Sequence, residues 1–219
     1  RQMCIRDRVY KAQRTERGKS FYSAIKIINI PGSQSELNSV RSETGDDQSV
    51  RQYFQNLVEE CIQEISTMEY FRGNSYIVSV EDFKVMEYLD AIGWEISIRM
   101  EYLTSFIEYC AEKQLTENEV IKLGMDLSRA LDYCRKLKII HRDIKPENIF
   151  VSRFGDFKLG DFGIARELER TMSGFSKKGT YSYMAPEMYK GEKYDSRVDI
   201  YSLGLVSVSY THLRAHETA

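Results

Sequence analysis

The sequence lacks the features by which several classes of protein are recognised. Its four cysteines form no Cys-x-x-Cys pair and are accompanied by only three histidines, which argues against a structural zinc site and against a disulfide framework. No run of apolar residues approaches the roughly 20 that a membrane-spanning helix needs, and the first residues carry no apolar signal core. The 31 Lys and Arg residues are offset by 33 Asp and Glu residues, so no excess of positive charge favours nucleic acid or an anionic membrane. We therefore expect a soluble protein of a reducing, cytoplasmic compartment.

The sequence nevertheless contains enough apolar material for a folded core. Hydrophobic residues make up 42% of the 219 positions, which excludes a disordered tail and sets an expectation of one domain, or of one domain and a fraction. A small, mostly β lobe is expected in roughly the first hundred residues and a helical lobe after it. The predicted fold class is therefore α+β, with two lobes.

Strand and helix periodicities predict the elements of the small lobe. The segment 21–28 is predicted to be a strand, because it is rich in β-branched and aromatic residues and stops at a Pro-Gly turn. Apolar positions that recur at threes and fours predict a helix from Val50 to about Gly73. The polar residues 33–49 before this helix are expected to form an exposed connection. Three further short strands are expected at 76–80, 83–88 and 94–100.

The helical lobe is marked by a capping pattern. A short helix is expected at 105–113. The sequence Thr116-Glu-Asn-Glu119 forms a capping box that opens a long amphipathic helix through Cys134.

Two clusters of polar and charged side chains follow this long helix. The segment 141–148, His-Arg-Asp-Ile-Lys-Pro-Glu-Asn, puts an acid, a cation and an amide on one tight loop, and Asp-Phe-Gly follows at 161–163 after a short strand pair. Phosphoryl transfer needs little covalent chemistry from a protein. It needs carboxylate and amide oxygens for Mg²⁺, a cation beside the phosphates and a base near the incoming hydroxyl. The two clusters together supply each of these parts.

The order of the motifs resembles that of protein kinases. Ala24-Ile-Lys26 lies on a predicted strand, and the loop at 141–148, Asp-Phe-Gly at 161–163 and Ala-Pro-Glu at 185–187 follow in that order. Each motif alone has an ordinary structural explanation, since an isolated Asp-Phe-Gly is more often an Asx turn than a metal site. Their joint occurrence, in this order and on these predicted elements, establishes the resemblance.

The resemblance implies a role for each polar residue of the loop. Asp143 would accept or orient the proton of the substrate hydroxyl, and Lys145 would neutralise the transferring phosphoryl group. Asn148 and Asp161 would hold Mg²⁺. The implied cofactors are ATP and Mg²⁺, and the implied partners are proteins that carry Ser or Thr hydroxyls.

Other residues would bind the nucleotide, again by resemblance. Lys26 would reach the α and β phosphates of ATP, held by a glutamate of the first helix. Glu64 is the best candidate for that glutamate because it precedes Ile65 on the packed face of the helix, and Glu59 and Glu60 are less well placed. The residues expected around adenine are Val9 and Ala24 above the ring, Phe150 below it, Met100 as gatekeeper, and the backbone of Glu101 and Leu103.

The same resemblance implies how the loop is supported. His141 and Phe162 would stack with Met68 and Val80 in an apolar column, and Asp199 on a later helix would anchor the loop. For Met68 and Val80, the apolar pattern alone also indicates core positions.

Several residues favour a Ser/Thr kinase over a Tyr kinase. Lys145 stands two places after Asp143, and Thr180 precedes the Ala-Pro-Glu motif and would help to shape the substrate pocket. Arg142 before the base indicates an activation segment that phosphorylation can order, because an arginine can pair a phosphate bidentately. Any one hydroxyl of that segment is more often a plain loop residue than an acceptor. The candidate acceptors are Thr171, Ser173 and Ser176.

The family pattern is expected to be incomplete at both ends. Residues 9–102 are assigned to the small lobe, without the first strand and the Gly-rich loop, and residues 103–206 to part of the large lobe. The flanks 1–8 and 207–219 resemble translated sequencing-adapter read-through, with natural termini as the alternative, and the last helix is expected not to continue past Val206. Such a fragment is expected to be weakly active or inactive by itself. A non-catalytic kinase-like scaffold is the alternative function, disfavoured because such scaffolds typically lose at least one of the catalytic residues named above.

Overall fold

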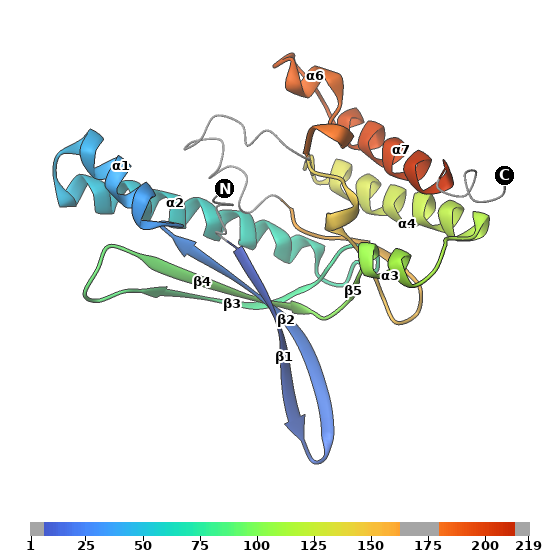
Figure 1. Ribbon diagram of the computed structural model, residues 1–219, viewed down its shortest axis with the longest axis horizontal. Coiled ribbons are helices and arrows are strands. Elements are labelled where there is room, and N and C mark those ends of the chain that lie inside the picture. The colour runs from blue at the N-terminus through green and yellow to red at the C-terminus, as the bar shows by residue number, and fades with distance from the viewer. Residues whose placement is uncertain (1–6, 163–179, 213–219) are drawn as a thin grey trace. The chain divides into compact units, whose positions relative to one another are not determined.

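The computed structural model describes residues 7–162 and 180–212, which divide into two compact units (Figure 1). Unit 1 comprises residues 7–72 and 79–102, and unit 2 comprises residues 73–78, 103–162 and 180–212. Each unit has its own sheet and its own helices, so the mixed α+β class expected from the sequence is confirmed.

Unit 1 is built on a four-stranded antiparallel sheet. Its strands are β1 (Asp7–Glu16), β2 (Lys19–Ile30), β3 (Val80–Glu87) and β4 (Trp94–Glu101). Their spatial order is β1-β2-β4-β3, which leaves β1 and β3 at the edges. The strands predicted at 21–28 and 94–100 are confirmed.

The segment before β3 differs from the sequence-based expectation. The strand predicted at 83–88 is confirmed as β3, but the strand predicted at 76–80 is not, since Ile77 forms only an isolated parallel bridge to Leu159. Val78 N donates to Leu159 O at 2.9 Å beside this bridge. The short apolar run thus pairs with a segment that is distant in the sequence, which local periodicity cannot reveal.

One long helix covers one face of this sheet (Figure 1). It is α2 (Asp47–Met68), followed by the single turn η1 (Glu69–Phe71). The helix predicted from Val50 is therefore confirmed. Alternate residues of a strand share a face, and Lys26, Ile28 and Ile30 of β2 are all buried. These three residues define the covered face of the sheet.

Residues 33–49 are not the exposed connection that their polar composition predicts. Most of them form the helix α1 (Gln34–Thr44), which Ser33 caps by accepting a backbone hydrogen bond. Leu37 and Val40 of this helix are buried. The prediction was wrong because two apolar side chains one turn apart are enough to dock a short polar helix, and so sparse a pattern looks like a loop in the sequence.

Unit 2 combines a small sheet with several helices. The sheet has the order β5-β6-β7, formed by β5 (Thr104–Ser105), β6 (Ile149–Val151) and β7 (Phe157–Leu159). The helices and 3-10 turns are α3 (Phe106–Glu112), α4 (Glu117–Lys136), η2 (Pro146–Asn148), η3 (Thr180–Tyr183), α6 (Pro186–Tyr189) and α7 (Arg197–His212). Helices α4 and α7 pack side by side (Figure 1). None of the helices in the described ranges is long and apolar enough to cross a membrane.

Helix α7 is longer than its sequence predicts. The polar residues after Val206 indicate an end there, but the helix continues to His212. The hydroxyls of Ser207, Ser209 and Thr211 each donate to the backbone oxygen four residues earlier, at 2.9, 2.9 and 2.7 Å. Hydroxyl side chains bonded in this way are compatible with a continuing helix, so the polar segment extends α7 instead of ending it.

The predicted capping box of α4 is confirmed. Thr116 Oγ1 accepts from Glu119 N at 3.2 Å, and a carboxylate oxygen of Glu119 accepts from Thr116 N at 2.9 Å. The same carboxylate accepts from Lys113 Nζ at 2.6 Å and from Tyr109 Oη at 2.9 Å. These donors, chiefly Lys113, lower the pKa of Glu119 to about 2. Ionised Glu119 therefore joins the end of α3 to the start of α4.

We expect Glu119→Gln to remove a pH-dependent part of the stability. The pKa of Glu119 is depressed in the folded chain, so its contribution to the free energy of unfolding is present above the ordinary value of 4.5 and is lost as the pH falls through about 2. Urea unfolding of wild type and variant, near pH 6 and again near pH 3, measures this loss. The gap in stability between them should narrow at the lower pH, and Glu117→Gln, at an exposed position of the same turn, is the control. A gap of the same size at both pH values contradicts the assignment.

Candidate active site

The loop at 141–148 is anchored by one buried carboxylate. Asp199 of α7 is 2% exposed and accepts hydrogen bonds from the backbone N–H groups of His141 and Arg142, both at 2.8 Å. Burial raises the pKa of Asp199 above its ordinary value, and the neighbouring His141 and the two backbone donors oppose that rise. Arg142 has a φ of 66°, which costs free energy for a non-glycine residue and which these hydrogen bonds help to hold. The expected anchoring of the loop by Asp199 is thus confirmed.

Two polar side chains of the loop meet at the carboxylate of a third. Asp143 Oδ2 lies 3.0 Å from Lys145 Nζ and accepts a hydrogen bond from Asn148 Nδ2 at 3.1 Å. Asn148 Nδ2 also donates to the backbone oxygen of Asp143 at 2.8 Å. Asn148 is 3% exposed and the side chain of Asp143 is 11% exposed, so the cluster is well enclosed. The structure brings together the residues predicted as base, phosphoryl-neutralising cation and metal-binding amide, whose chemical roles stay predictions.

Asn148 and Asp161 offer the ligand types that Mg²⁺ prefers. Because the amide nitrogen of Asn148 is directed at Asp143, the amide oxygen is the atom that can face a cation. Gly160 N donates to Asn148 O at 2.9 Å, so Asp161 follows directly after the residue that pairs with Asn148. Mg²⁺ takes one or two protein oxygens and completes its octahedron with phosphates and water, which this pair fits. The described residues contain no group of three or more His, Cys, Asp or Glu side chains that could hold a metal ion.

His141 links the loop to the turn that carries Asp161. Its Nε2 lies 3.0 Å from Gly160 O, and its Nδ1 accepts from Asp143 N at 3.3 Å, which assigns the neutral ring with its proton on Nε2. Burial lowers the pKa of His141, against the opposing effect of nearby carboxylates. The ring also packs edge-on against Phe162, with 4.5 Å between centroids. The predicted contact of His141 with Phe162 is confirmed, and His141 holds the site together as a neutral group.

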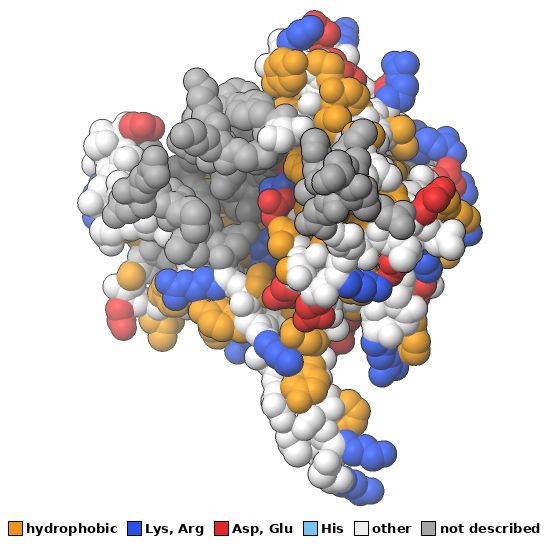
Figure 2. Space-filling view, turned by 45° about the vertical axis from the view of Figure 1, so that its right-hand side comes forward, with side chains coloured by type: hydrophobic (Ala, Val, Ile, Leu, Met, Phe, Trp, Pro, Cys, Tyr) orange, Lys and Arg blue, Asp and Glu red, His pale blue; other side chains and the backbone are white. Residues whose placement is uncertain are grey.

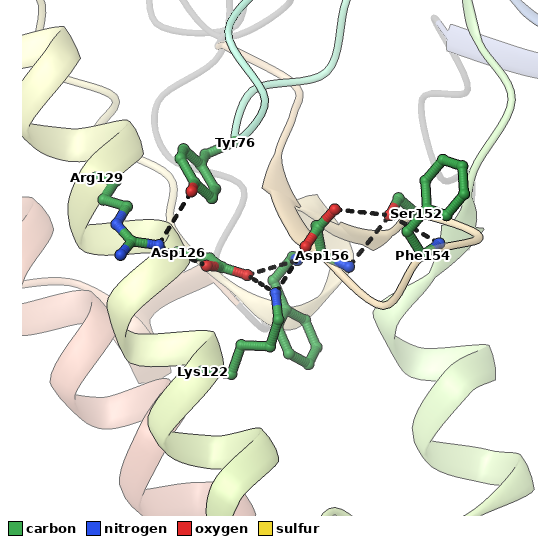
Figure 3. Close-up of polar contacts among 8 residues, drawn as sticks. Tyr76, Lys122, Asp126, Arg129, Ser152, Phe154 and Asp156 are labelled. Carbon is green, nitrogen blue, oxygen red and sulfur yellow. Dashed lines mark hydrogen bonds and ion pairs between the residues drawn. The ribbon is translucent and has the colours of Figure 1, made fainter.

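A buried acid on α4 positions the β6–β7 hairpin (Figure 3). The strands of this hairpin lie in the sequence between the loop at 141–148 and Asp161. Asp126 is 2% exposed, and its Oδ2 accepts from Phe157 N at 3.1 Å. Lys122 Nζ binds Asp126 and also lies 2.8 Å from Asp156 Oδ1, and Arg129 Nη1 lies 3.4 Å from Asp126 Oδ1. Sequence reasoning missed this cluster. Its signal is an acid at an otherwise apolar helix position, with a lysine four residues before it and an arginine three residues after it.

We expect Gly160→Ala to destabilise the chain by about 1–3 kcal/mol. A Cβ at Gly160 would lie 2.8 Å from Phe150 Cε2 and 2.8 Å from Val78 Cγ2, so at least one of these side chains would have to move. Gly124 on α4 is the matched control, because a Cβ there has nothing within 4 Å, and alanine raises the helix propensity by about 1 kcal/mol. Urea denaturation is the measurement. Equal stabilities of the two variants contradict the close packing at Gly160.

The predicted phosphate-binding lysine and its glutamate lie on facing elements of unit 1. Lys26 is 4% exposed and shares the face of β2 that α2 covers. Glu64 is half-buried on α2, whereas Glu59 and Glu60 are exposed. This difference in exposure supports Glu64 over the other two glutamates as the residue directed towards the sheet.

The same face of the sheet carries an apolar, partly open patch beside Lys26. In the strand register, Ala24 lies opposite Lys11 of β1 and Met100 of β4, and Lys26 lies opposite Val9. Residues directly opposite each other point to the same face, so Val9, Ala24 and Met100 share the face of Lys26. Val9 is 64% exposed, and Ala24 and Met100 are half-buried. An accessible apolar patch beside a buried cation fits a ligand with a flat apolar ring and an anionic group.

The connection after β4 contains the predicted adenine partners Glu101 and Leu103. Glu101 N donates to Ser79 O at 3.1 Å, and Ser79 N donates to Glu101 Oε1 at 2.8 Å. The division between the units falls between Tyr102 and Leu103. Phe150, predicted to lie below the ring, is on β6 of unit 2. The part that these residues play in nucleotide binding stays a prediction.

Some predicted residues fall outside the described part of the chain. They are Gly163 and the candidate acceptors Thr171, Ser173 and Ser176, together with the side chain of Thr180. Their roles stay predictions.

Curated relatives of this chain include kinases from distant organisms. The chain is 29% identical over 198 residues to the serine/threonine-protein kinase pakA of Dictyostelium discoideum, a match that covers 86% of this chain and 16% of that protein. It is 30% identical over 204 residues to the serine/threonine-protein kinase dst1 of the same organism, covering 91% and 24%. It is 41% identical over 112 residues to the MAP kinase kinase mkk-4 of Caenorhabditis elegans, covering 50% and 31%.

The chain spans less than a third of the length of each of these relatives. A family model described as the protein kinase domain matches residues 8–215, which includes nearly all of the described part of both units and the whole polar loop at 141–148. That match and the geometry around Asp143, Asn148 and Asp199 agree with the order of motifs in the sequence. The chain therefore belongs to the protein kinase family.

Proposed function

We propose that this chain is a catalytic domain that transfers the γ-phosphate of ATP to Ser or Thr hydroxyls of proteins, with Mg²⁺ as cofactor. The observation that carries the proposal is the carboxylate of Asp143, held between Lys145 Nζ at 3.0 Å and Asn148 Nδ2 at 3.1 Å. The similarity to proteins named as serine/threonine kinases supports the choice of acceptor.

Asp143 is the residue that handles the proton in this reaction. Its carboxylate orients the substrate hydroxyl and accepts its proton while the hydroxyl oxygen attacks the γ-phosphorus and the bond to the β-phosphate breaks. Lys145 places a positive charge within 3.0 Å of the same carboxylate. That charge offsets the negative charge of the phosphoryl group during transfer, and the enclosed setting strengthens the effect.

The remaining residues hold the nucleotide and orient the carboxylates. Asn148 and Asp161 would hold Mg²⁺, which when bound offsets the charge of the phosphates. Neutral His141 fixes the turn before Asp161 through Gly160 O. Lys26 of unit 1 would bind the phosphates as a buried cation.

Phosphate transfer by the chain itself tests the proposal. Incubated with labelled ATP, Mg²⁺ and a mixture of dephosphorylated proteins, the chain is expected to label Ser and Thr slowly, and EDTA is expected to abolish the labelling. Lys26→Met is the matched negative control, because it removes the phosphate-binding cation and leaves the contacts of Asp143 unchanged. Labelling of Tyr would overturn the Ser/Thr assignment. Nucleotide binding without any transfer would instead favour a non-catalytic kinase-like scaffold.

A further inference from the structure

A lysine and two tyrosines form a compact cluster at one end of the sheet in unit 1. Lys11 Nζ lies 4.4 Å from the centroid of the Tyr22 ring and 4.4 Å from that of the Tyr102 ring. The two rings are 6.1 Å apart and inclined at 45°. An ammonium group within about 6 Å of a ring centroid is attracted by the ring, and here one ammonium engages two rings. Basic and hydrophobic side chains gather on the β1–β2 hairpin at the bottom of Figure 2.

The cluster lies on the face of the sheet that carries the predicted nucleotide-binding residues. Lys11 is directly opposite Ala24, and Tyr22 is two residues before Ala24 on β2, so both share its face. Tyr22 and Tyr102 are 45% and 44% exposed. The cluster therefore borders the open apolar patch and is not part of the buried core.

Tyr102 lies in the segment of backbone that is predicted to bind adenine. It stands between Glu101 and Leu103, whose peptide groups are the predicted partners of adenine. Glu101 is fixed by its two hydrogen bonds with Ser79. The Tyr102 ring, which follows β4, is in contact with Lys11 of β1. The contact of Lys11 with Tyr102 thus restrains the peptide groups that precede and follow that ring.

We propose that Lys11 is a positioning residue for nucleotide binding, which acts by holding Tyr102 and so the backbone of residues 101–103. The proposal rests on the proposed function, because it needs adenine to bind that backbone. Lys11 is not a catalytic residue in this scheme and touches neither the phosphates nor the reacting atoms. Loss of its ammonium group loosens the connection after β4 and weakens the binding of any adenine nucleoside.

Nucleotide affinity measured by calorimetry tests the proposal. Lys11→Met keeps the length of the side chain and removes its charge, and it is expected to weaken the binding of ATP and of adenosine by the same factor, about threefold to tenfold. Lys11→Arg is expected to restore the affinity, because a guanidinium group also stacks on aromatic rings. The matched control is Arg14→Met, since Arg14 lies 5.5 Å from the Phe21 ring on the opposite face of the same hairpin.

A loss for ATP without a loss for adenosine would overturn the proposal and make Lys11 a phosphate ligand. Equal affinities of wild type and Lys11→Met, or an equal loss in Arg14→Met, would also overturn it. If the wild-type chain binds no nucleotide, the proposed function fails instead. Amide hydrogen exchange of residues 100–103 without nucleotide then still tests whether Lys11 restrains this backbone. The exchange should be faster in Lys11→Met and unchanged in Arg14→Met.

Discussion

Asp143→Asn is expected to reduce the rate of phosphate transfer by at least about 100-fold, because an amide cannot accept the proton of the attacking hydroxyl. The replacement has nearly the same shape and keeps one oxygen that can accept from Lys145 Nζ and Asn148 Nδ2. The fold and the affinity for ATP are therefore expected to stay unchanged. Initial rates of labelling at saturating ATP, together with the nucleotide dissociation constant, separate the two effects.

The matched control for this variant is Asp132→Asn on α4. Asp132 is 47% exposed and forms ion pairs with Arg135 and Lys136, both at 2.8 Å, away from the polar loop. Its replacement removes one carboxylate of the same kind. It should leave the transfer rate unchanged, because exposed ion pairs contribute little to the stability of the fold. Equal rates in Asp143→Asn and wild type would refute Asp143 as the group that accepts the proton. In that case, Lys145 and Asn148 would belong to a binding site and not to a site of proton transfer.

The residues of the polar loop could be predicted because they are adjacent in the sequence. Asp143, Lys145 and Asn148 fall on one short loop, so their chemistry is visible without any tertiary information. Asp199 is far from them in the sequence and could be linked to the loop only through the resemblance to a known family. The hydrogen bonds of Asp199 to His141 and Arg142 supply the physical reason for that link.

Other features could not be predicted because they depend on contacts between distant segments. The buried residues of helix α1 are Leu37 and Val40, which form too sparse a pattern to be recognised in a polar stretch. The buried carboxylate of Asp126 accepts a hydrogen bond from Phe157 N, and the folding of the β6–β7 hairpin brings these two groups together. The contact of Lys11 with Tyr102 likewise requires the register of β1, β2 and β4. The local sequence is therefore enough to predict the polar residues of the loop at 141–148. The contacts that hold the surrounding elements in place depend on the pairing of distant segments.

Asp199→Ala on α7 removes the anchor of the loop at 141–148 and leaves the side chains of Asp143, Lys145 and Asn148 chemically unchanged. This change leaves the buried N–H group of His141 and the part-buried N–H group of Arg142 without their acceptor, and an unsatisfied buried donor costs about 1–3 kcal/mol. We expect the free energy of unfolding to fall by about 2–5 kcal/mol in urea denaturation. The transfer rate should also fall, because the positive φ of Arg142 is no longer held and Asp143 moves with it.

Asp199→Asn separates the hydrogen bonds from the charge. It keeps one acceptor oxygen and removes a carboxylate whose pKa is raised by burial, so part of the cost of enclosing a charge is recovered. We expect its stability to lie between those of wild type and Asp199→Ala. Asp195→Ala is the control, because the side chain of Asp195 is exposed and accepts hydrogen bonds from Arg197 at the start of the same helix. If Asp199→Ala were no less stable than Asp195→Ala, the two backbone hydrogen bonds would not be what holds the loop. The positive φ of Arg142 would then have to be maintained by the packing of His141 against Phe162.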